Sequence, residues 1–333
     1  MISSKGSIVV TGSVAFDYLM RFPGKFVEHL MPDRLDRLSV SFLVDELRRV
    51  PGGCAPNIAY GLALLGERPM IFATAGHDAK EYRDWLATQG IDVTHLRLED
   101  DLFTASFFVS SDQDQNQIAS FYTGAMARAR DLSLTSLAAE DVALVVVSPN
   151  DPAAMARYCE ECRTGRLPFL YDPSQQVARL SGKELATGLE GAAVLILNDY
   201  ELGILQSKTG LSAAELQGKV GALVVTHGAE GSTVASHSEA GPIRHQIPAA
   251  RVEGTVQEPT GVGDAFRAGL LRGLRAGAPW PVAGRVGSVA AVYTLETQGP
   301  QPPRYPREAF ASRYERNFGK EPWLEKVLAG AGR

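Results

Sequence analysis

Short apolar runs alternate with segments of helical periodicity along most of this chain, and this alternation constrains the fold more than any other sequence feature. The runs that we expect to form buried strands lie at residues 8–11, 70–73, 93–96, 142–148, 168–171, 194–197 and 223–226. Strand and helix in regular succession are typical of a mostly parallel sheet with helices on both faces. The sequence therefore predicts an α/β fold.

Proline near helix starts and glycine after helix ends place the helices between these strands. The predicted helices open at Pro56, near Ala79, after Pro152, after Ser212, at Asp264 and at Pro279, and a polar helix follows the Pro-rich turn at 300–306. The chain has no internal repeat and no low-complexity linker. We therefore expect a single domain over residues 1–333.

One stretch breaks the alternation. Residues 103–109 and 118–122 flank the polar turn 112–116 and have the pattern of a β-hairpin. Together with residues 39–44, the hairpin is expected to form a small sheet apart from the main one. This predicts a small β lid contributed by about residues 13–50 and 103–123.

Several polar residues follow predicted strands, at the edge where open parallel sheets bind ligands. These positions are Asp17, Asp172, Asn198, Gly228 and the loop before Asp264. They predict a cleft covered by the lid. Each of them taken alone is also an ordinary turn residue.

Charge and hydropathy argue against two classes of partner. Lys and Arg number 33 and Asp and Glu 38, a net charge of −5, so no overall positive field attracts nucleic acid. The longest apolar stretches fall far short of the ~18 residues that cross a bilayer. Three cysteines, and a first segment without a secretory pattern, predict a cytoplasmic protein.

The most informative motif is PTGVGDAF at residues 259–266, a glycine-rich turn that runs into a helix. Gly261 and Gly263 let neighbouring backbone N–H groups converge, and the helix start adds partial positive charge, so the turn is suited to an anion. Asp264 is placed to take a proton from a hydroxyl that attacks this anion. The alternative is a tight turn in which Asp264 only caps the helix.

Other motifs carry less chemistry. The chain has neither G-x-x-x-x-G-K-[ST] nor a first strand followed by G-x-G-x-x-G, which argues against a P-loop ATPase and a simple dinucleotide-binding oxidoreductase. Cys159 and Cys162 have C-x-x-C spacing without a second metal-binding pair, so we expect a structural pair on a helix. The six histidines show neither metal spacing nor a hydrolase arrangement.

The diglycine Gly52-Gly53 with Ala55 and Asn57, taken together with residues 259–266, resembles the paired signatures of the ribokinase-like (PfkB) sugar and nucleoside kinases. Longer segments are similar to bacterial adenosine kinases of actinobacterial type: TGSVAFDYLMRFP (11–23), SVSFLVD (39–45), IASFYTGAM (118–126), DPSQQVARL (172–180) and TGVGDAFRAG (260–269). The resemblance covers nearly the whole chain. It implies a ribokinase-like fold, with a Rossmann-like central sheet and a small β lid, and transfer of the γ-phosphoryl group of ATP to the 5′-hydroxyl of adenosine.

The resemblance also assigns site residues by position. The catalytic base matches Asp264, and the anion hole matches Gly261, Val262 and Gly263. The nucleoside site matches Ser13, Asp17, Ser41, Gly53, Asn57, Phe107, Phe121, Gln175, Gln176 and Arg179. The ATP site matches Asn198, Thr226, Gly228, Gly261 and Gly263, and Glu201 matches a magnesium position that acts through water.

Four of these positions have a specific implied role. Asp17 accepts hydrogen bonds from the ribose hydroxyls, and Arg179 reaches the phosphates. Phe107 and Phe121 sandwich the adenine on the closing lid. The alternative for the two aromatic side chains is a small hydrophobic core within the hairpin.

The resemblance implies ATP and Mg²⁺ as cosubstrate and cofactor and a homodimer formed through the lid sheet. The sequence departs from the family at Glu258, where the signature usually begins with Asp near a monovalent-cation site, so K⁺ dependence is left open. Cys54 and Pro56 beside the diglycine are also unusual. Two alternatives to an adenosine kinase stay open: a ribose or other sugar kinase of the same family, and a non-catalytic nucleoside-binding protein.

Overall fold

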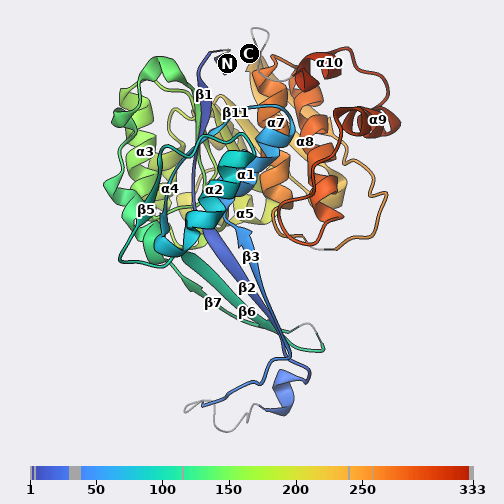
Figure 1. Ribbon diagram of the computed structural model, residues 1–333. Coiled ribbons are helices and arrows are strands. Elements are labelled where there is room, and N and C mark those ends of the chain that lie inside the picture. Colours follow the sequence, from blue (N-terminus) through green and yellow to red (C-terminus); the bar gives the residue numbers. More distant parts are fainter. Residues whose placement is uncertain are drawn as a thin grey trace.

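The strands form two separate sheets in the computed structural model, which describes residues 2–3, 5–29, 39–114, 116–238, 241–257 and 259–329 (Figure 1). The main sheet contains β1 (Ser7–Thr11), β4 (Met70–Gly76), β5 (Leu96–Glu99), β8 (Val142–Val147), β9 (Phe169–Tyr171), β10 (Val194–Asn198), β11 (Ala222–Thr226), β12 (Ser232–Ser238) and β13 (Gly241–Ile247). Its order is β13-β12-β11-β10-β9-β8-β1-β4-β5. The β11–β12 and β12–β13 pairs are antiparallel and the others parallel, which confirms the predicted mostly parallel sheet.

Helices cover both faces of this sheet. They are α1 (Cys54–Leu64), α2 (Lys80–Thr88), α3 (Pro152–Thr164), α4 (Gly182–Leu189), α5 (Asp199–Thr209), α6 (Ala213–Lys219), α7 (Val262–Arg275), α8 (Trp280–Leu295), α9 (Arg307–Phe318) and α10 (Trp323–Leu328). In β8, Leu144 and Val146 pack into the core on the side of α1, α7 and α8, whereas Val145 and Val147 pack into the core on the side of α3 and α4. Burial on both faces is why the central strands are continuous apolar runs in the sequence.

The small sheet projects from one end of the main body (Figure 1). It consists of β2 (Ala15–Arg21), β3 (Glu46–Gly52), β6 (Ala105–Ser111) and β7 (Gln117–Tyr122) in the order β3-β2-β6-β7. The antiparallel β6–β7 pair is the predicted hairpin, with Phe107 opposite Phe121. A small sheet separate from the main one is thereby confirmed.

Two predictions about this sheet are wrong. Its third segment is β3, not residues 39–44, which form no regular strand. Phe42 in that segment packs on Phe22 and Phe26, beyond the end of β2. Asp17 lies within β2 rather than in a loop after β1, since β2 pairs along its whole length with β3 and β6. An aspartate is a poor strand residue, and it concealed this strand in the sequence.

Other differences are shifts of a few residues. Helix α1 begins at Cys54, so Pro56 lies within its first turn, where a missing N–H leaves no helical bond unmade. The predicted strand at 93–96 is β5, shifted later because the Asp92 carboxylate accepts the Thr94 N–H and forms a turn.

The antiparallel pair β12–β13 was not predicted.

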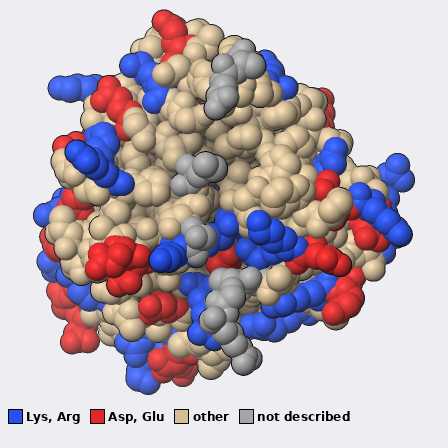
Figure 2. Space-filling model, turned by 90° about the horizontal axis from the view of Figure 1, so that it is seen from above, with Lys and Arg blue, Asp and Glu red and all other residues tan. Residues whose placement is uncertain are grey.

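The remaining expectations concern surface and cysteines. No helix of the described residues is long and apolar enough to span a membrane. Cys159 and Cys162 are buried free thiols on α3, as expected for a structural pair. On the face shown in Figure 2, basic and acidic side chains are interspersed.

Candidate active site

A cavity of about 380 Å³ lies where the carboxyl ends of the main-sheet strands meet the small sheet. Its wall is formed by the turn after β1, the start of α1, β2, β6 and β7 on one side, and by β10, β11 and the start of α7 on the other. Parallel sheets bind ligands at this edge, and the volume is within the range of small-molecule sites.

The glycine-rich turn forms the first turn of α7 at the cavity wall. Gly261 is the N-cap residue with φ 78°, and a Cβ there would lie 2.5 Å from the Pro300 side chain, so only glycine fits. The Ala265 N–H makes the first helical bond, to the Gly261 carbonyl at 2.9 Å. The N–H groups of Gly263 and Asp264 precede it and have no helical acceptor, so they are available to an anion.

Val262 does not fit the predicted anion hole in this structure. Its N–H donates to the Pro259 carbonyl at 3.3 Å, and its side chain is not part of the cavity wall. The tight turn that places Gly263 at the wall is closed by this bond. Val262 therefore shapes the turn, and the binding role remains a prediction for Gly261 and Gly263.

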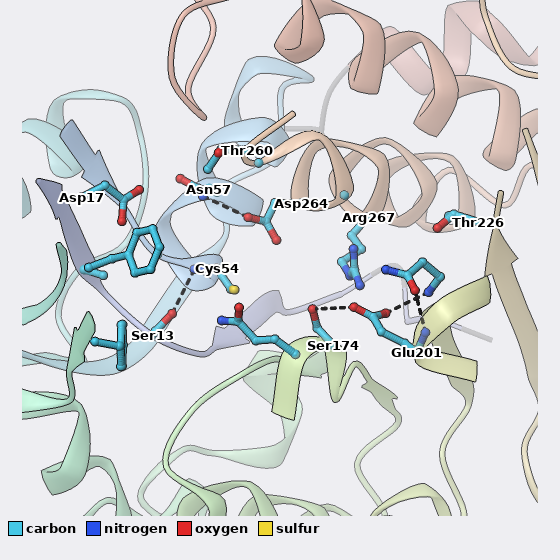
Figure 3. Close-up of a pocket in the computed structure, with 18 of the residues that line it drawn as sticks. Ser13, Asp17, Cys54, Asn57, Ser174, Glu201, Thr226, Thr260, Asp264 and Arg267 are labelled. Carbon is cyan, nitrogen blue, oxygen red and sulfur yellow. Dashed lines mark hydrogen bonds between the residues drawn. The ribbon is translucent and has the colours of Figure 1, made fainter. Parts of the chain in front are cut away.

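Asp264 is half-buried at the centre of the cavity, and its Oδ2 accepts a hydrogen bond from Asn57 Nδ2 at 2.9 Å (Figure 3). Burial raises the pKa of Asp264 to about 7, against the opposing effects of the Arg267 charge and the Asn57 hydrogen bond. A carboxylate with a pKa near neutrality is well matched to accept a proton. The structure thus supports a role as general base rather than only a helix cap.

Most of the residues predicted to bind the nucleoside line the cavity. The predicted residues that line it are Ser13, Asp17, Gly53, Asn57, Phe107, Phe121 and Gln175. Phe107 and Phe121 are cross-strand partners on one face of the small sheet, and the cavity wall includes both of them. Ser13 has a structural role as well, because its hydroxyl accepts the Cys54 N–H at 3.2 Å.

The opposite wall carries the predicted nucleotide residues Asn198, Glu201 and Thr226. Asn198 and Glu201 form a capping box at the start of α5: Asn198 Oδ1 accepts the Glu201 N–H at 2.7 Å, and Glu201 Oε2 accepts the Asn198 N–H at 2.8 Å. Glu201 Oε1 accepts the Ser174 hydroxyl at 3.2 Å. Glu201 is 8% exposed, and its role in holding Mg²⁺ stays a prediction.

Besides Asp264, the cavity wall includes Arg267 and Ser174, which the sequence reasoning did not assign to the site. Arg267, one turn later on α7, lines the cavity and forms a buried ion pair with Asp172. Ser174 also lines the cavity, with a left-handed φ of 41°. The i, i+3 spacing of Asp264 and Arg267 was the available signal, since it places both side chains on one helix face.

Four further predicted residues are not brought to the cavity. Ser41 lies in the irregular segment beside Phe42, and Arg179 and Gly228 are exposed outside the cavity wall. Gln176 is buried, donates to the Asn150 carbonyl at 2.9 Å and does not line the cavity. Their ligand-binding roles stay predictions. Glu258 lies outside the described residues.

Comparisons with known proteins match nearly the whole of this chain. A sequence model described as "pfkB family carbohydrate kinase" matches residues 8–307. A nucleoside kinase of Methanothermobacter thermautotrophicus is 28% identical over 96% of this chain and 99% of its own.

Solved structures extend the comparison. A Burkholderia thailandensis nucleoside kinase in complex with inosine is 36% identical, with a TM-score of 0.83 over 95% of this chain and 99% of its own. The same protein in complex with ADP-inosine is 37% identical, with a TM-score of 0.81. The match covers 95% of this chain and 97% of that protein. A Thermotoga maritima ribokinase shares the fold, with a TM-score of 0.74 and 18% identity. The match covers 93% of this chain and 99% of the ribokinase.

Proposed function

This chain belongs to the pfkB family of carbohydrate kinases, phosphotransferases that act on an alcohol group, and we propose that its acceptor is the 5′-hydroxyl of a purine nucleoside. Its ribokinase-like fold is confirmed by the structural neighbours. Adenosine is the substrate that the sequence resemblance predicts, and inosine is bound by the Burkholderia thailandensis relative. ATP is the proposed phosphoryl donor.

One observation carries this proposal above all: a pair of aromatic side chains and a candidate base line the same cavity. Phe107 and Phe121 offer a stacking surface on the small sheet, and Asp264 lies on α7 opposite them. A flat purine fits an aromatic surface, and its attached ribose is then next to Asp17 and Asn57. A free sugar lacks the flat base that such an aromatic pair can sandwich.

The proposed reaction uses groups that the cavity wall provides. Asp264 accepts the proton of the 5′-hydroxyl, whose oxygen forms the new bond to the γ-phosphorus while the bond to the bridging oxygen breaks and ADP leaves. The N–H groups at the start of α7 stabilise the charge on the transferred group. Closure of the small sheet over the nucleoside excludes water, which limits ATP hydrolysis.

Magnesium is part of this proposal. Glu201 would hold the ion through water, beside Asn198 and Thr226 on the nucleotide wall. When bound, Mg²⁺ neutralises phosphate charge.

Activation by K⁺ is a separate question. It is tested by replacing K⁺ with a bulky organic cation in the assay.

The small sheet also supports the proposed homodimer. Leu47, Ile118 and Tyr122 are exposed on its strands, and β7 is an open edge in which every residue is exposed. Exposed apolar side chains on an unpaired strand favour pairing with another chain. Light scattering that gives the mass of a monomer would remove this proposal.

A cytoplasmic location is proposed on the basis of the cysteines. Cys54, Cys159 and Cys162 are all free thiols. Free thiols persist in a reducing compartment, where ATP is also available. Fractionation of cells that express the tagged protein tests this location.

The decisive experiment measures ADP release from Mg-ATP with adenosine, inosine, guanosine, cytidine, ribose and fructose, run in parallel with Asp264→Asn. We expect turnover with purine nucleosides, strongest with adenosine, and its loss in the variant. Preference for ribose or fructose would establish a sugar kinase and remove the stacking role of Phe107 and Phe121. Nucleoside binding without turnover would favour the binding-protein alternative.

A further inference from the structure

A buried ion pair joins α7 to the end of β9 at the floor of the cavity. Arg267 Nη2 donates to Asp172 Oδ1 at 2.6 Å, and Nε lies 2.5 Å from Oδ2. The two side chains are 8% and 1% exposed. Burial by itself lowers the pKa of Arg267, but the attraction and hydrogen bond of Asp172 outweigh it and raise the pKa above its ordinary value. The guanidinium is therefore a fixed cation.

The Nε and Nη2 nitrogens of Arg267 face Asp172, and the third nitrogen, Nη1, does not pair with it. Nη1 forms no hydrogen bond with any residue that the structure describes. It lies against the start of α7, because a Cβ built on Gly263 would be only 2.7 Å from it. The same first turn carries the N–H groups available to an anion. Nη1 therefore lies beside the helix turn that carries these N–H groups.

This region lies between the two functional walls. In Figure 3 the Arg267 guanidinium lies between the Asp264 and Glu201 carboxylates, the proposed base and the proposed magnesium residue. The γ-phosphoryl group must pass between these walls during transfer. Arg179, which the sequence resemblance assigned to the phosphates, is exposed and outside the cavity wall.

We propose that Arg267, held in place by Asp172, contacts the transferring γ-phosphoryl group through Nη1 and stabilises its charge in the transition state. This inference rests on the proposed kinase function. As the nucleoside oxygen bonds to the γ-phosphorus, the bond to the bridging oxygen breaks, its electron pair leaves with ADP, and the hydroxyl proton goes to Asp264. Arg267 exchanges no proton or electron and contributes fixed positive charge beside the equatorial oxygens.

The same helix provides a matched control. Arg272 forms a comparable buried pair with Glu67 at 2.9 Å, and its side chain is 3% exposed, but it lies outside the cavity wall. Arg267→Gln and Arg272→Gln therefore break equivalent buried pairs at different distances from the reaction. A purely structural role predicts similar losses of thermal stability and of activity in the two variants.

We expect Arg267→Gln to lower kcat by at least about 100-fold, with nucleoside affinity in the absence of ATP within about 3-fold of wild type, an allowance of ~0.7 kcal/mol. Arg272→Gln should retain kcat in its folded fraction. A kcat of Arg267→Gln close to wild type, or an equal loss in both variants, would overturn the proposal. If the wild-type enzyme phosphorylates no nucleoside, it is the proposed function that fails.

Arg267→Lys covers the case in which the glutamine variant does not fold, because it keeps the buried charge. A single ammonium cannot pair with Asp172 and reach the phosphoryl group together, so kcat should fall by at least about 10-fold. A second readout is thermal stabilisation of wild type by ADP, nucleoside and aluminium fluoride, which imitates the transferring group. Arg267→Lys should keep the stabilisation by ADP and nucleoside and lose the increment from aluminium fluoride; an increment equal to wild type contradicts the proposal.

Discussion

Asn57 Nδ2 donates a 2.9 Å hydrogen bond to Asp264 Oδ2 across 207 residues of sequence, and this bond joins α1 to α7 at the candidate base. A second hydrogen bond, from Gln301, fixes the orientation of the Asn57 amide. Gln301 Nε2 donates to Asn57 Oδ1 at 3.1 Å and to the Tyr82 hydroxyl oxygen at 2.6 Å. With its oxygen held by Gln301, Asn57 can only present its amino group to the base.

Asp264→Asn should remove turnover while leaving nucleoside binding nearly intact. Loss of a general base lowers kcat by at least about 100-fold, whereas an amide of equal size keeps the cavity shape. Calorimetric titration with adenosine gives the affinity and coupled ADP release gives kcat. A turnover close to wild type would reduce Asp264 to a helix cap.

The same variant should be more stable than wild type in alkaline solution. Because the folded-state pKa of Asp264 is raised to about 7, ionisation weakens the fold as pH rises from the unfolded pKa near 4 through 7. Asparagine does not ionise, so the gain at about pH 8 should be on the order of 1–2 kcal/mol, discounted because solvent reaches the carboxylate. At pH values below 4 the two unfolding free energies should converge; a constant difference at all pH values would contradict the raised pKa.

The pH profile of kcat/KM should show an acid limb with a midpoint near the Asp264 pKa of about 7. Protonated Asp264 cannot accept the hydroxyl proton, so activity falls towards lower pH. Asn57→Leu removes the hydrogen bond that lowers this pKa, so the limb should shift to higher pH. If the acid limb of Asn57→Leu has the same midpoint as wild type, the limb reports the titration of a group other than Asp264.

Gln301 is a positioning residue for the base, and two substitutions separate its effects. Gln301→Leu should lower kcat by about five- to tenfold, the value of one hydrogen bond of ~1 kcal/mol. Gln301→Glu should lower kcat further, because a carboxylate would attract the Asn57 amino group away from Asp264. Arg304→Ala, in the same turn but bonded to Gln89, is the control and should leave kcat unchanged. Equal kinetics in all three variants would exclude a positioning role.

Phe107→Ala should weaken adenosine binding by roughly 1–3 kcal/mol, the scale of base stacking on an aromatic side chain. Phe108→Ala is the matched control, since its ring stacks on Tyr18 with centroids 4.7 Å apart and is not part of the cavity wall. Steady-state KM and direct binding should agree. Unchanged adenosine kinetics in Phe107→Ala would remove this residue from the base site and favour a hairpin core.

Local chemistry explains what could be predicted from the sequence. The main sheet follows from strands buried on both faces, which leave continuous apolar runs such as β8, and the turn before α7 follows from Gly261 and Gly263. A base next to an anion site needs neighbouring residues only, so Asp264 could be predicted as the candidate base without a structure.

Long-range relationships could not be predicted in the same way. β2 has Asp17 at its centre and is a strand only because β3 and β6 pair with it. The resemblance assigned the phosphates to Arg179, but the tertiary structure leaves that side chain exposed and places Arg267 between the two walls.

The sequence by itself therefore determined the fold class, the glycine-rich turn before α7 and the candidate base, because each depends on residues close together in the chain. The tertiary structure alone decided which side chains surround that base. The Asn57–Asp264 bond and the Asp172–Arg267 pair join residues 207 and 95 positions apart. The packing of α1, α7 and the strand ends brings these residues together. That packing cannot be read from the residues adjacent to each of them in the sequence.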